Sequence, residues 1–208
     1  MGEIINTLNK FHDPQRLEYL YHGTSSHFFP SLLKGIDSSR SQATKDFGQG
    51  FYVSSSYSVA ASNAQKAANR NTGSLPIVFT YKLNPAYMNN RYSILVFKEP
   101  DEDWLGFILS NKCPTKEKSR LHYPNRFPGY HDIIYGPLAD GFPAFMATVK
   151  KFEKTNPITE TDQVLLLERV SAGFDFPSND QFVFKNQYDV NSMLTRTKIT
   201  VLKGGHLK

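Results

Sequence analysis

Residues 17–25 read LEYLYHGTS, a stretch that combines the pattern of a strand with the residue types of a binding turn. Apolar residues alternate at its start, which predicts a half-buried strand over 18–21. His22, Gly23 and Thr24 follow at once, and the missing side chain at the glycine lets a ligand approach the main chain. A histidine after a strand is more often structural, so this stretch is a candidate site only together with a second element.

Residues 47–56, FGQGFYVSSS, supply that second element. Gly48 and the second glycine of this motif allow backbone angles that are closed to other residues. On a strand, Phe51 faces the core while Tyr52 and Ser54 face the other side. An aromatic plane and hydroxyls beside bare main chain suit a planar aromatic ligand. The alternative is a β-bulge whose tyrosine simply packs.

The rest of the chain mixes helices and strands without a regular βαβ alternation, which predicts an α+β fold with mostly antiparallel strands. We expect a polar loop over 38–45 and either a helix or a strand over 161–170. We expect further helices over 4–11, 26–34, 58–70, 101–111 and 142–152, and strands over 77–83, 92–98, 132–135, 181–184 and 198–202.

The composition is typical of a single globular domain spanning residues 1–208. Hydrophobic residues make up 39% of the chain, too many for a disordered one, and no apolar run is long enough to cross a membrane. Cys113 is the only cysteine, so no intramolecular disulfide can form and a cytoplasmic setting is expected. The net charge of +5 favours anionic partners only mildly.

Other nucleotide and metal motifs are missing from the sequence. It contains neither GxGxxG nor a P-loop, so those two kinds of phosphate site are not supported. His22 and His27 share a segment, but no HExxH motif or paired cysteines accompany them, and no metal is expected.

The segments YHGTSSHFFPSLLKGI and FGQGFYVSSSYSVAA, taken together, resemble the first two motifs of the ADP-ribosyltransferases of the diphtheria-toxin and poly-ADP-ribose polymerase branch. DFGQGFY, with the later HDIIYGPLADG and DQFVF, is also similar to a bacterial group of small domains in the same clan. The first two motifs cover roughly the N-terminal third of the chain.

This resemblance implies a split β-sandwich with mostly antiparallel strands and peripheral helices, which holds NAD as co-substrate in a cleft. It implies that His22 hydrogen-bonds a ribose hydroxyl, that the Gly23 main chain holds the nicotinamide amide, and that Tyr52 stacks on the nicotinamide ring. The family's second stacking tyrosine falls near Asn63, so Tyr57 is the expected substitute. The implied NAD contacts are His22, Gly23, Thr24, Gly50, Phe51, Tyr52, Ser54 and Tyr57.

The family also has a glutamate at the start of a late strand, which stabilises positive charge beside the breaking bond. The matching strand here reads NDQFVF, so the catalytic set becomes His22, Tyr52 and Gln181. A glutamine can hold a hydroxyl but carries no charge, and that loss costs a few kcal/mol. Glu168 and Asp180 are the alternative carboxylates, although Asp180 points to the other face of a regular strand.

The segment 112–131, KCPTKEKSRLHYPNRFPGYH, is the candidate acceptor site. Basic groups interleaved with aromatic rings suit single-stranded nucleic acid, because phosphates are neutralised and bases stack. The alternative is a solvated, proline-pinned loop with a few rings in the core. The candidate acceptor contacts are Lys116, Lys118, Arg120, Tyr123 and Arg126.

The resemblance therefore implies a mono-ADP-ribosyltransferase that cleaves the nicotinamide–ribose bond of NAD and modifies a macromolecule, either RNA or single-stranded DNA. Such an enzyme would act as an intracellular toxin or defence effector, with an antitoxin protein as its partner. The alternatives are a protein-modifying transferase, an NAD glycohydrolase, and an inactive module that binds NAD or ADP-ribose.

Overall fold

The structure is a computed structural model that describes residues 2–5, 18–43, 45–84, 91–112, 121–139, 158–172 and 179–203. The predicted helix over 142–152 and residues 6–11 of the predicted leading helix lie outside these ranges. The elements in chain order are β1 (Gly2–Ile5), β2 (Tyr19–Ser25), η2 (Ser26–Phe28), α1 (Phe29–Lys34), η3 (Ser38–Arg40), β3 (Phe51–Val53), α2 (Tyr57–Arg70), β4 (Pro76–Leu83), β5 (Ile94–Phe97), α3 (Glu102–Lys112), β6 (Ile133–Pro137), α6 (Glu160–Ala172), β7 (Asp180–Phe184), α7 (Val190–Met193) and β8 (Leu194–Val201).

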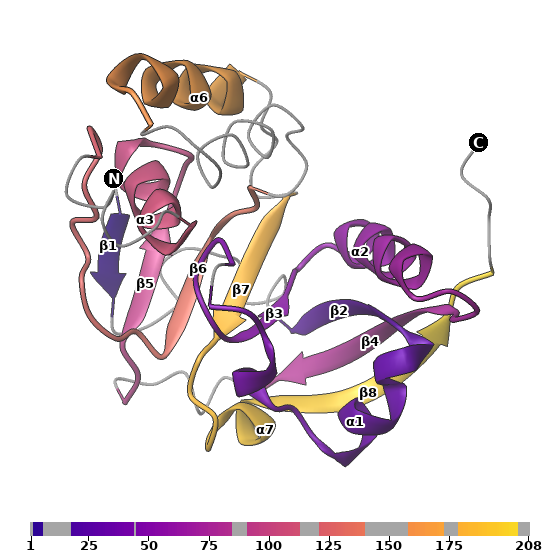
Figure 1. Cartoon of the computed structure of the whole chain (residues 1–208). Helices are drawn as coiled ribbons and strands as arrows, with labels where there is room; N and C mark the ends of the chain where they lie inside the picture. Colours follow the sequence, from indigo (N-terminus) through magenta and orange to yellow (C-terminus); the bar gives the residue numbers. More distant parts are fainter. Residues whose placement is uncertain are drawn as a thin grey trace.

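These strands form two sheets (Figure 1). The five-stranded sheet has the order β1-β5-β6-β7-β3, and the three-stranded sheet has the order β2-β4-β8. The pairing of β5 with β6 is parallel, while the other described ladders are antiparallel. The predicted α+β fold with mostly antiparallel strands is therefore confirmed.

The two sheets meet where β2 passes the end of β3. Tyr21 and Ser54 exchange two main-chain hydrogen bonds, with N–O distances of 2.8 and 2.9 Å. On one side of this bridge the chain turns away into α2, and on the other side β2 and β3 form no further described pairs. One pair of hydrogen bonds thus joins the strands that carry the HGT and GFY motifs.

A shared hydrophobic core lies between the facing sides of the two sheets. Leu20, Phe79 and Tyr81 come from the three-stranded sheet. Phe51 and Phe182 come from the five-stranded sheet and belong to the same cluster. The outer faces of β4 and β7 are covered as well, since Val78 packs under α2 and Val183 lies in a second core, so the apolar runs of these strands show little alternation with polar residues.

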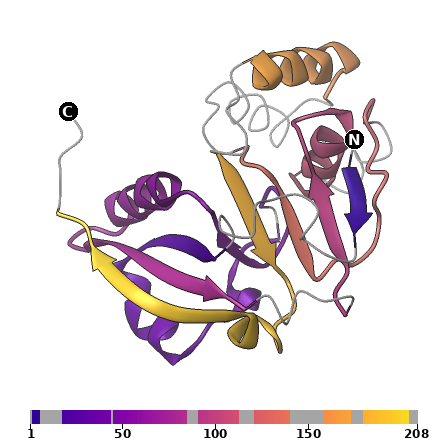
Figure 2. The same cartoon turned by 180° about the vertical axis from the view of Figure 1, so that it is seen from behind.

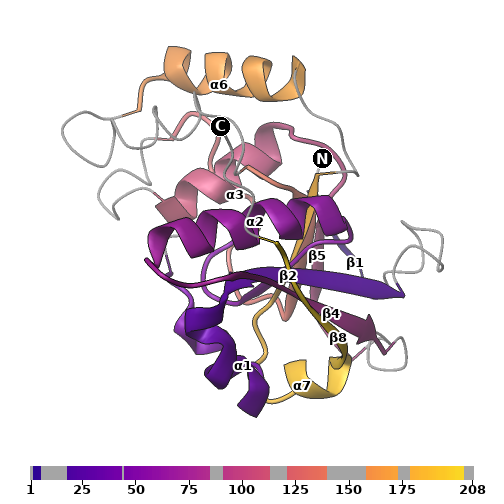
Figure 3. The same ribbon diagram turned by 90° about the vertical axis from the view of Figure 1, so that its right-hand side faces the viewer.

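Helices cover the outer faces of both sheets (Figures 1 and 3). Ala60 and Ala64 of α2 pack on Val78 of β4, and these small side chains let the helix lie close to the sheet. On the far side, α3 and α6 enclose a second core against β5, β6 and β7. The segment from Asp103 to Leu109 is buried, which agrees with a helix covered on more than one side.

The sequence predictions differ from the structure at a few elements. The helix predicted over 4–11 is wrong at Ile4 and Ile5, because these residues form β1 and pair with Leu95 and Ile94 of β5. The ambiguous segment 161–170 is helical, within α6. The last strand starts at Leu194 rather than 198.

Strand β8 forms an outer edge of the three-stranded sheet (Figure 2). Its register with β4 shifts between Thr80 and Tyr81, so Thr197 is the extra residue of a bulge. Its hydroxyl donates to the Thr80 carbonyl at 3.2 Å. Arg196 and Lys198 flank the bulge and are exposed.

None of the helices in the described parts of the chain is both long and apolar enough to cross a bilayer.

Candidate functional site

The His22 imidazole connects the two motifs. Its Nδ1 lies 2.7 Å from the main-chain oxygen of Tyr52. A carbonyl oxygen can only accept, so Nδ1 carries the hydrogen and donates. Burial lowers the pKa of His22, more than the hydrogen bond to Tyr52 raises it, and this favours the neutral ring. The neutral Nδ1–H tautomer leaves Nε2 as a free acceptor for a hydroxyl group.

Phe51 holds the imidazole in place from one side. The two ring centres are 4.6 Å apart with an interplanar angle of 32°. Phe51 is buried, as the alternation along β3 predicts, and it contacts Tyr81 edge-to-face. The ring orientation of His22 is therefore set by a stacking surface and a hydrogen bond together.

The Gly23 main chain lies at an open edge of β2. Tyr21 directs its N–H and C=O toward Ser54, so its pairing with Thr80 of β4 is of the non-hydrogen-bonded kind. Gly23 lies two residues further along and directs its own N–H and C=O to the same side. In the antiparallel register of the Tyr21–Ser54 bridge this side faces Tyr52 of β3, but the two strands form no further ladder there, and no described residue bonds these two groups. They form a donor–acceptor pair suited to a carboxamide.

The absence of a side chain at Gly23 has an intramolecular cause. A Cβ atom there would lie 1.7 Å from the carbonyl oxygen of Ala60 in α2. Similarly, a Cβ atom at Gly50 would lie 2.5 Å from Cγ1 of Val183 and 2.9 Å from the Phe184 carbonyl oxygen. Both glycines permit close packing of the chain on itself, which the sequence does not distinguish from room for a ligand.

Tyr52 is held by its hydroxyl group. It donates to the Gly48 carbonyl at 2.6 Å and accepts from the Phe47 N–H at 3.1 Å. Burial, together with the nearby Asp46 carboxylate, raises the pKa of Tyr52 well above its usual value. Since side chains alternate along β3, the Tyr52 ring leaves on the face opposite Phe51. His22 and Tyr52 thus meet through the Tyr52 carbonyl and not ring to ring.

Asp180 fastens β7 to the turn that follows β3. One carboxylate oxygen accepts from the Ser54 hydroxyl at 2.7 Å and from the Ser55 N–H at 2.8 Å. The other accepts from the Ser55 hydroxyl at 2.5 Å. Asp180 is fully buried, and with Ser54 and Ser55 it forms a cluster that we call the Asp180 latch. The serine run of the sequence hinted at hydroxyl contacts, but not at this partner.

Gln181 lies next to the latch on β7, the strand in which the third motif was expected. It is buried, and its Nε2 donates to the Pro137 carbonyl at 3.3 Å. By strand alternation it shares a face with Val183, which pairs with Tyr52. Its amide is thus tied to β6.

The third carboxylate candidate lies elsewhere. Glu168 is exposed on α6; burial raises the pKa of Tyr123 and the charge of Glu168 adds to that rise, which places Glu168 near that ring. Figures 1 and 3 both show α6 beyond α3, well away from β2. The structure therefore groups Asp180 and Gln181 with the HGT and GFY motifs, and places Glu168 outside that group.

The remaining NAD candidates divide between the core and the surface. Thr24 and Ser54 are buried. Tyr57 begins α2, is 40% exposed, and meets Tyr21 edge-to-face with ring centres 5.4 Å apart. It lies on the outer side of β2, close to the open edge at Gly23, where a second ring was expected.

The described residues of the candidate acceptor segment form ion pairs and packing contacts with the rest of the protein. Lys112 forms a nearly buried ion pair with Asp46 at 2.7 Å. Arg126 pairs with Asp103 at 3.3 Å, although its own side chain is 58% exposed. Tyr123 packs against the second core. Lys116, Lys118 and Arg120 lie outside the described residues. The contacts of the described residues agree with the alternative prediction, a loop with a few rings in the core.

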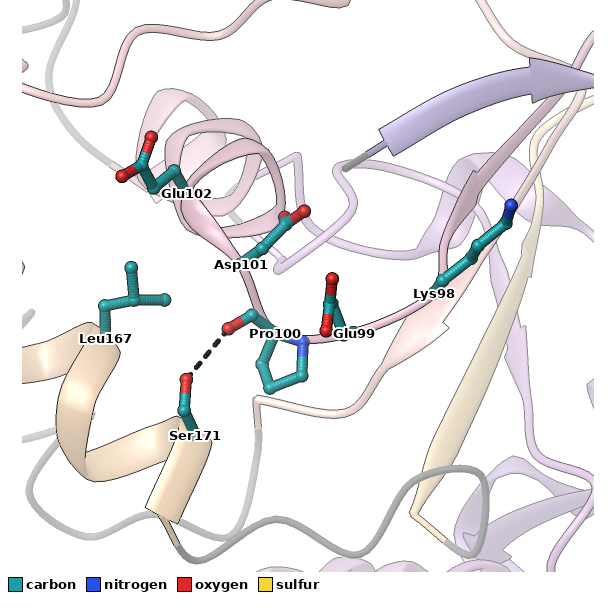
Figure 4. Close-up of a pocket in the computed structure, with 7 residues that line it drawn as sticks. All are labelled: Lys98, Glu99, Pro100, Asp101, Glu102, Leu167 and Ser171. Atoms are coloured by element: carbon teal, nitrogen blue, oxygen red, sulfur yellow. Dashed lines mark hydrogen bonds between the residues drawn. The ribbon is translucent and has the colours of Figure 1, made fainter.

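A separate depression of about 510 Å³ lies between α3 and α6 (Figure 4). The Ser171 hydroxyl donates to the Pro100 carbonyl across it at 3.1 Å. Three carboxylates border it, which disfavours the phosphates of a dinucleotide. Its lining consists of Lys98, Glu99, Pro100, Asp101, Glu102, Leu167 and Ser171.

Comparison with known proteins gives one match. A family described as "Protein of unknown function (DUF3990)" matches residues 19–194, from the first residue of β2 to the first residue of β8. Searches of curated proteins and of solved structures found no match. The matched range contains His22, Tyr52, Asp180 and Gln181.

Proposed function

The chain belongs to the DUF3990 family, and we propose that it is a mono-ADP-ribosyltransferase that uses NAD as co-substrate. The observation that carries this proposal is the open edge of β2. The Gly23 N–H and C=O face the side where β2 and β3 separate, and the adjacent residue His22 offers its Nε2 as an acceptor. A carboxamide and a ribose hydroxyl, held side by side, are the groups that nicotinamide riboside offers.

The fold supports the same proposal. An ADP-ribosyltransferase of this branch is a split β-sandwich, with its nucleotide cleft where the sheets part. Here a five-stranded and a three-stranded sheet share a core and join through Tyr21 and Ser54. We assign the cleft to the side of that bridge where Gly23 lies.

In the proposed reaction the nicotinamide–ribose bond breaks, and its electron pair leaves with nicotinamide. The Gly23 main chain holds the departing carboxamide, and His22 Nε2 accepts from a ribose hydroxyl. A nucleophile of the acceptor then bonds to the positively charged ribose carbon and loses its proton. Tyr57, exposed beside Tyr21, is the ring best positioned to stack on nicotinamide.

The third catalytic position favours a second candidate function. Asp180 has its oxygens engaged by Ser54 and Ser55, and Gln181 is neutral. The ribose carbon thus lacks a free carboxylate among these candidates, so charge stabilisation in the transition state is weak. This arrangement favours slow NAD hydrolysis or binding of NAD or ADP-ribose without turnover.

For the acceptor we propose a macromolecule, with single-stranded nucleic acid ahead of protein because of the basic, aromatic composition of 112–131. A transferase of this kind requires control, so we further propose an intracellular toxin or defence effector with an antitoxin partner.

Incubation with NAD labelled in its adenylate part tests these assignments, with and without total RNA or cell protein. Label transferred to RNA supports the nucleic-acid acceptor, and label on protein supports the protein acceptor. Free ADP-ribose alone identifies a hydrolase. Intact NAD that nevertheless binds identifies the module, and intact NAD without binding refutes the NAD site. His22→Ala is the matched variant, in which every NAD-dependent signal should fall.

A further inference from the structure

Lys185 has a fixed position immediately after β7. Its N–H donates to the Asp132 carbonyl at 2.8 Å, and its own carbonyl accepts from the Ser38 hydroxyl at 3.2 Å. The main chain is therefore held on both sides, and the side chain starts from a rigid point.

The side chain of Lys185 runs over the two glycines of the GQG motif. Its Cγ lies 3.3 Å from the place where Gly50 would carry a Cβ, and its Nζ lies 3.3 Å from the corresponding place at Gly48. Gly48 has a φ of 80°, which any other residue adopts at a cost. The Lys185 side chain therefore occupies the space that the two missing side chains leave, and its ammonium group lies beside Gly48.

The groups around the ammonium do not neutralise it. Asn111 donates its amide hydrogens to the Asp46 and Phe107 carbonyls, so its neutral Oδ1 faces Gly48. The Asp46 carboxylate is already paired with Lys112. Among the described residues, none forms an ion pair or hydrogen bond with Lys185 Nζ.

This uncompensated charge is energetically unfavourable. Lys185 is partly buried, and burial lowers its pKa. Burial lowers the pKa of the neighbouring His131, and the positive charge of Lys185 lowers it further. A rigid, desolvated and unpaired cation is the arrangement expected of a group that awaits an anionic ligand.

We propose that Lys185 binds a phosphate group beside Gly48. The site stands apart from the β2 edge and does not depend on turnover of NAD. Lysine suits this role as a compact point charge with three donors. The phosphate could come from a dinucleotide or from a nucleic acid strand, and the experiment below separates these sources.

The first test is a titration of the full chain with inorganic phosphate, followed by NMR signals of lysine side chains at constant ionic strength. The Lys185 Cε signals should shift and saturate, while those of exposed Lys66 on α2 should not. Equal, unsaturated shifts at both lysines would overturn the proposal.

Stability provides a second readout that a merely structural lysine would fail. In phosphate-free buffer Lys185→Gln should raise the melting temperature, because it removes an uncompensated charge. Phosphate should then stabilise the wild type but not this variant. A lower melting temperature for Lys185→Gln, with Lys66→Gln unchanged, would assign the ammonium to a structural contact and reject the site.

Affinities for NAD and for a single-stranded RNA identify the source. Lys185→Gln should weaken one of them about tenfold, the typical loss for one charge-assisted hydrogen bond, and Lys66→Gln should weaken neither. Loss only with NAD assigns the dinucleotide phosphate, and loss only with RNA assigns the strand. If both affinities stay unchanged while inorganic phosphate still shifts Lys185, the site is one for free phosphate.

Discussion

At the scale of single residues, His22 has a structural role, and the proposed function gives it a chemical one as well. Its Nδ1–H is used within the protein, and Nε2 remains for a ligand. The sequence predicted this histidine, but it could not show which nitrogen is free, because that depends on Tyr52, thirty positions away. The glycines are the converse case, since their patterns suggested ligand contact and the structure assigns them packing contacts as well.

The lowered pKa of His22 predicts a pH dependence of stability. The unfolded state takes up a proton below the ordinary histidine value of about 6.5, while the folded state resists protonation. Stability is therefore full above that pH and falls as pH drops through the lowered folded pKa. His131 adds in the same direction, since burial lowers its pKa too. Melting curves between pH 8 and 5 check this, and His22→Gln should flatten the decline; an unchanged slope would contradict it.

Tyr52 and Tyr57 should affect different properties. Tyr52→Phe loses the bonds to Gly48 and Phe47 and should cost about 1–2 kcal/mol of unfolding free energy, with NAD affinity kept. Tyr57→Ala removes the ring assigned to stacking and should weaken NAD binding by about 1–3 kcal/mol. Denaturant melts and calorimetric titration measure the two effects. If Tyr57→Ala binds NAD normally, nicotinamide does not stack on that ring.

At the scale of elements, the latch and the bridge act together. Asp180 holds Ser54 and Ser55 to β7, and Ser54 holds Tyr21 of β2. The edge at Gly23 is therefore positioned by three strands through polar contacts. Periodicity reveals such strands but not their lateral order, which explains why the latch was not predictable from the sequence.

Asp180→Ala should be the most damaging change at this junction. It leaves the Ser54 hydroxyl and both Ser55 donors unpaired, which should cost about 3 kcal/mol or more of unfolding free energy. Asp180→Asn keeps the shape and should cost less. Urea melts measure both, and Ser62→Ala on the exposed side of α2 is the control. If Asp180→Ala were as stable as the wild type, the latch would carry no stability.

The local elements followed well from the sequence. The predicted helix over 58–70 is α2, and Ala60, Ala64 and Ala68 lie on its buried face. Gly35 ends α1 with a φ of 136°. Local pattern failed at Ile4 and Ile5, because β5 supplies their partners from ninety residues away. It also left α6 ambiguous, since only Gln163, Leu166 and Val170 of that helix are buried.

At the scale of the whole molecule, we expect the shared core to make the two sheets one cooperative unit. Phe182 is fully buried in it and stacks on Tyr135 with ring centres 4.2 Å apart. Phe182→Ala should cost about 3–5 kcal/mol. Hydrogen exchange should accelerate in β4 and β6 alike, although they belong to different sheets. Faster exchange confined to β6 would show that the sheets unfold separately, against a single domain.

The bulge at Thr197 has a consequence for crowded solutions of this protein. A regular edge strand has unpaired main-chain groups, so strands of other copies can pair with it and the molecules can aggregate. In β8 the bulge bends the strand, and Arg196 and Lys198 place positive charge beside it. Both features disfavour pairing with the edge strand of another molecule. We therefore expect that concentrated solutions of the protein do not aggregate through strand addition at β8.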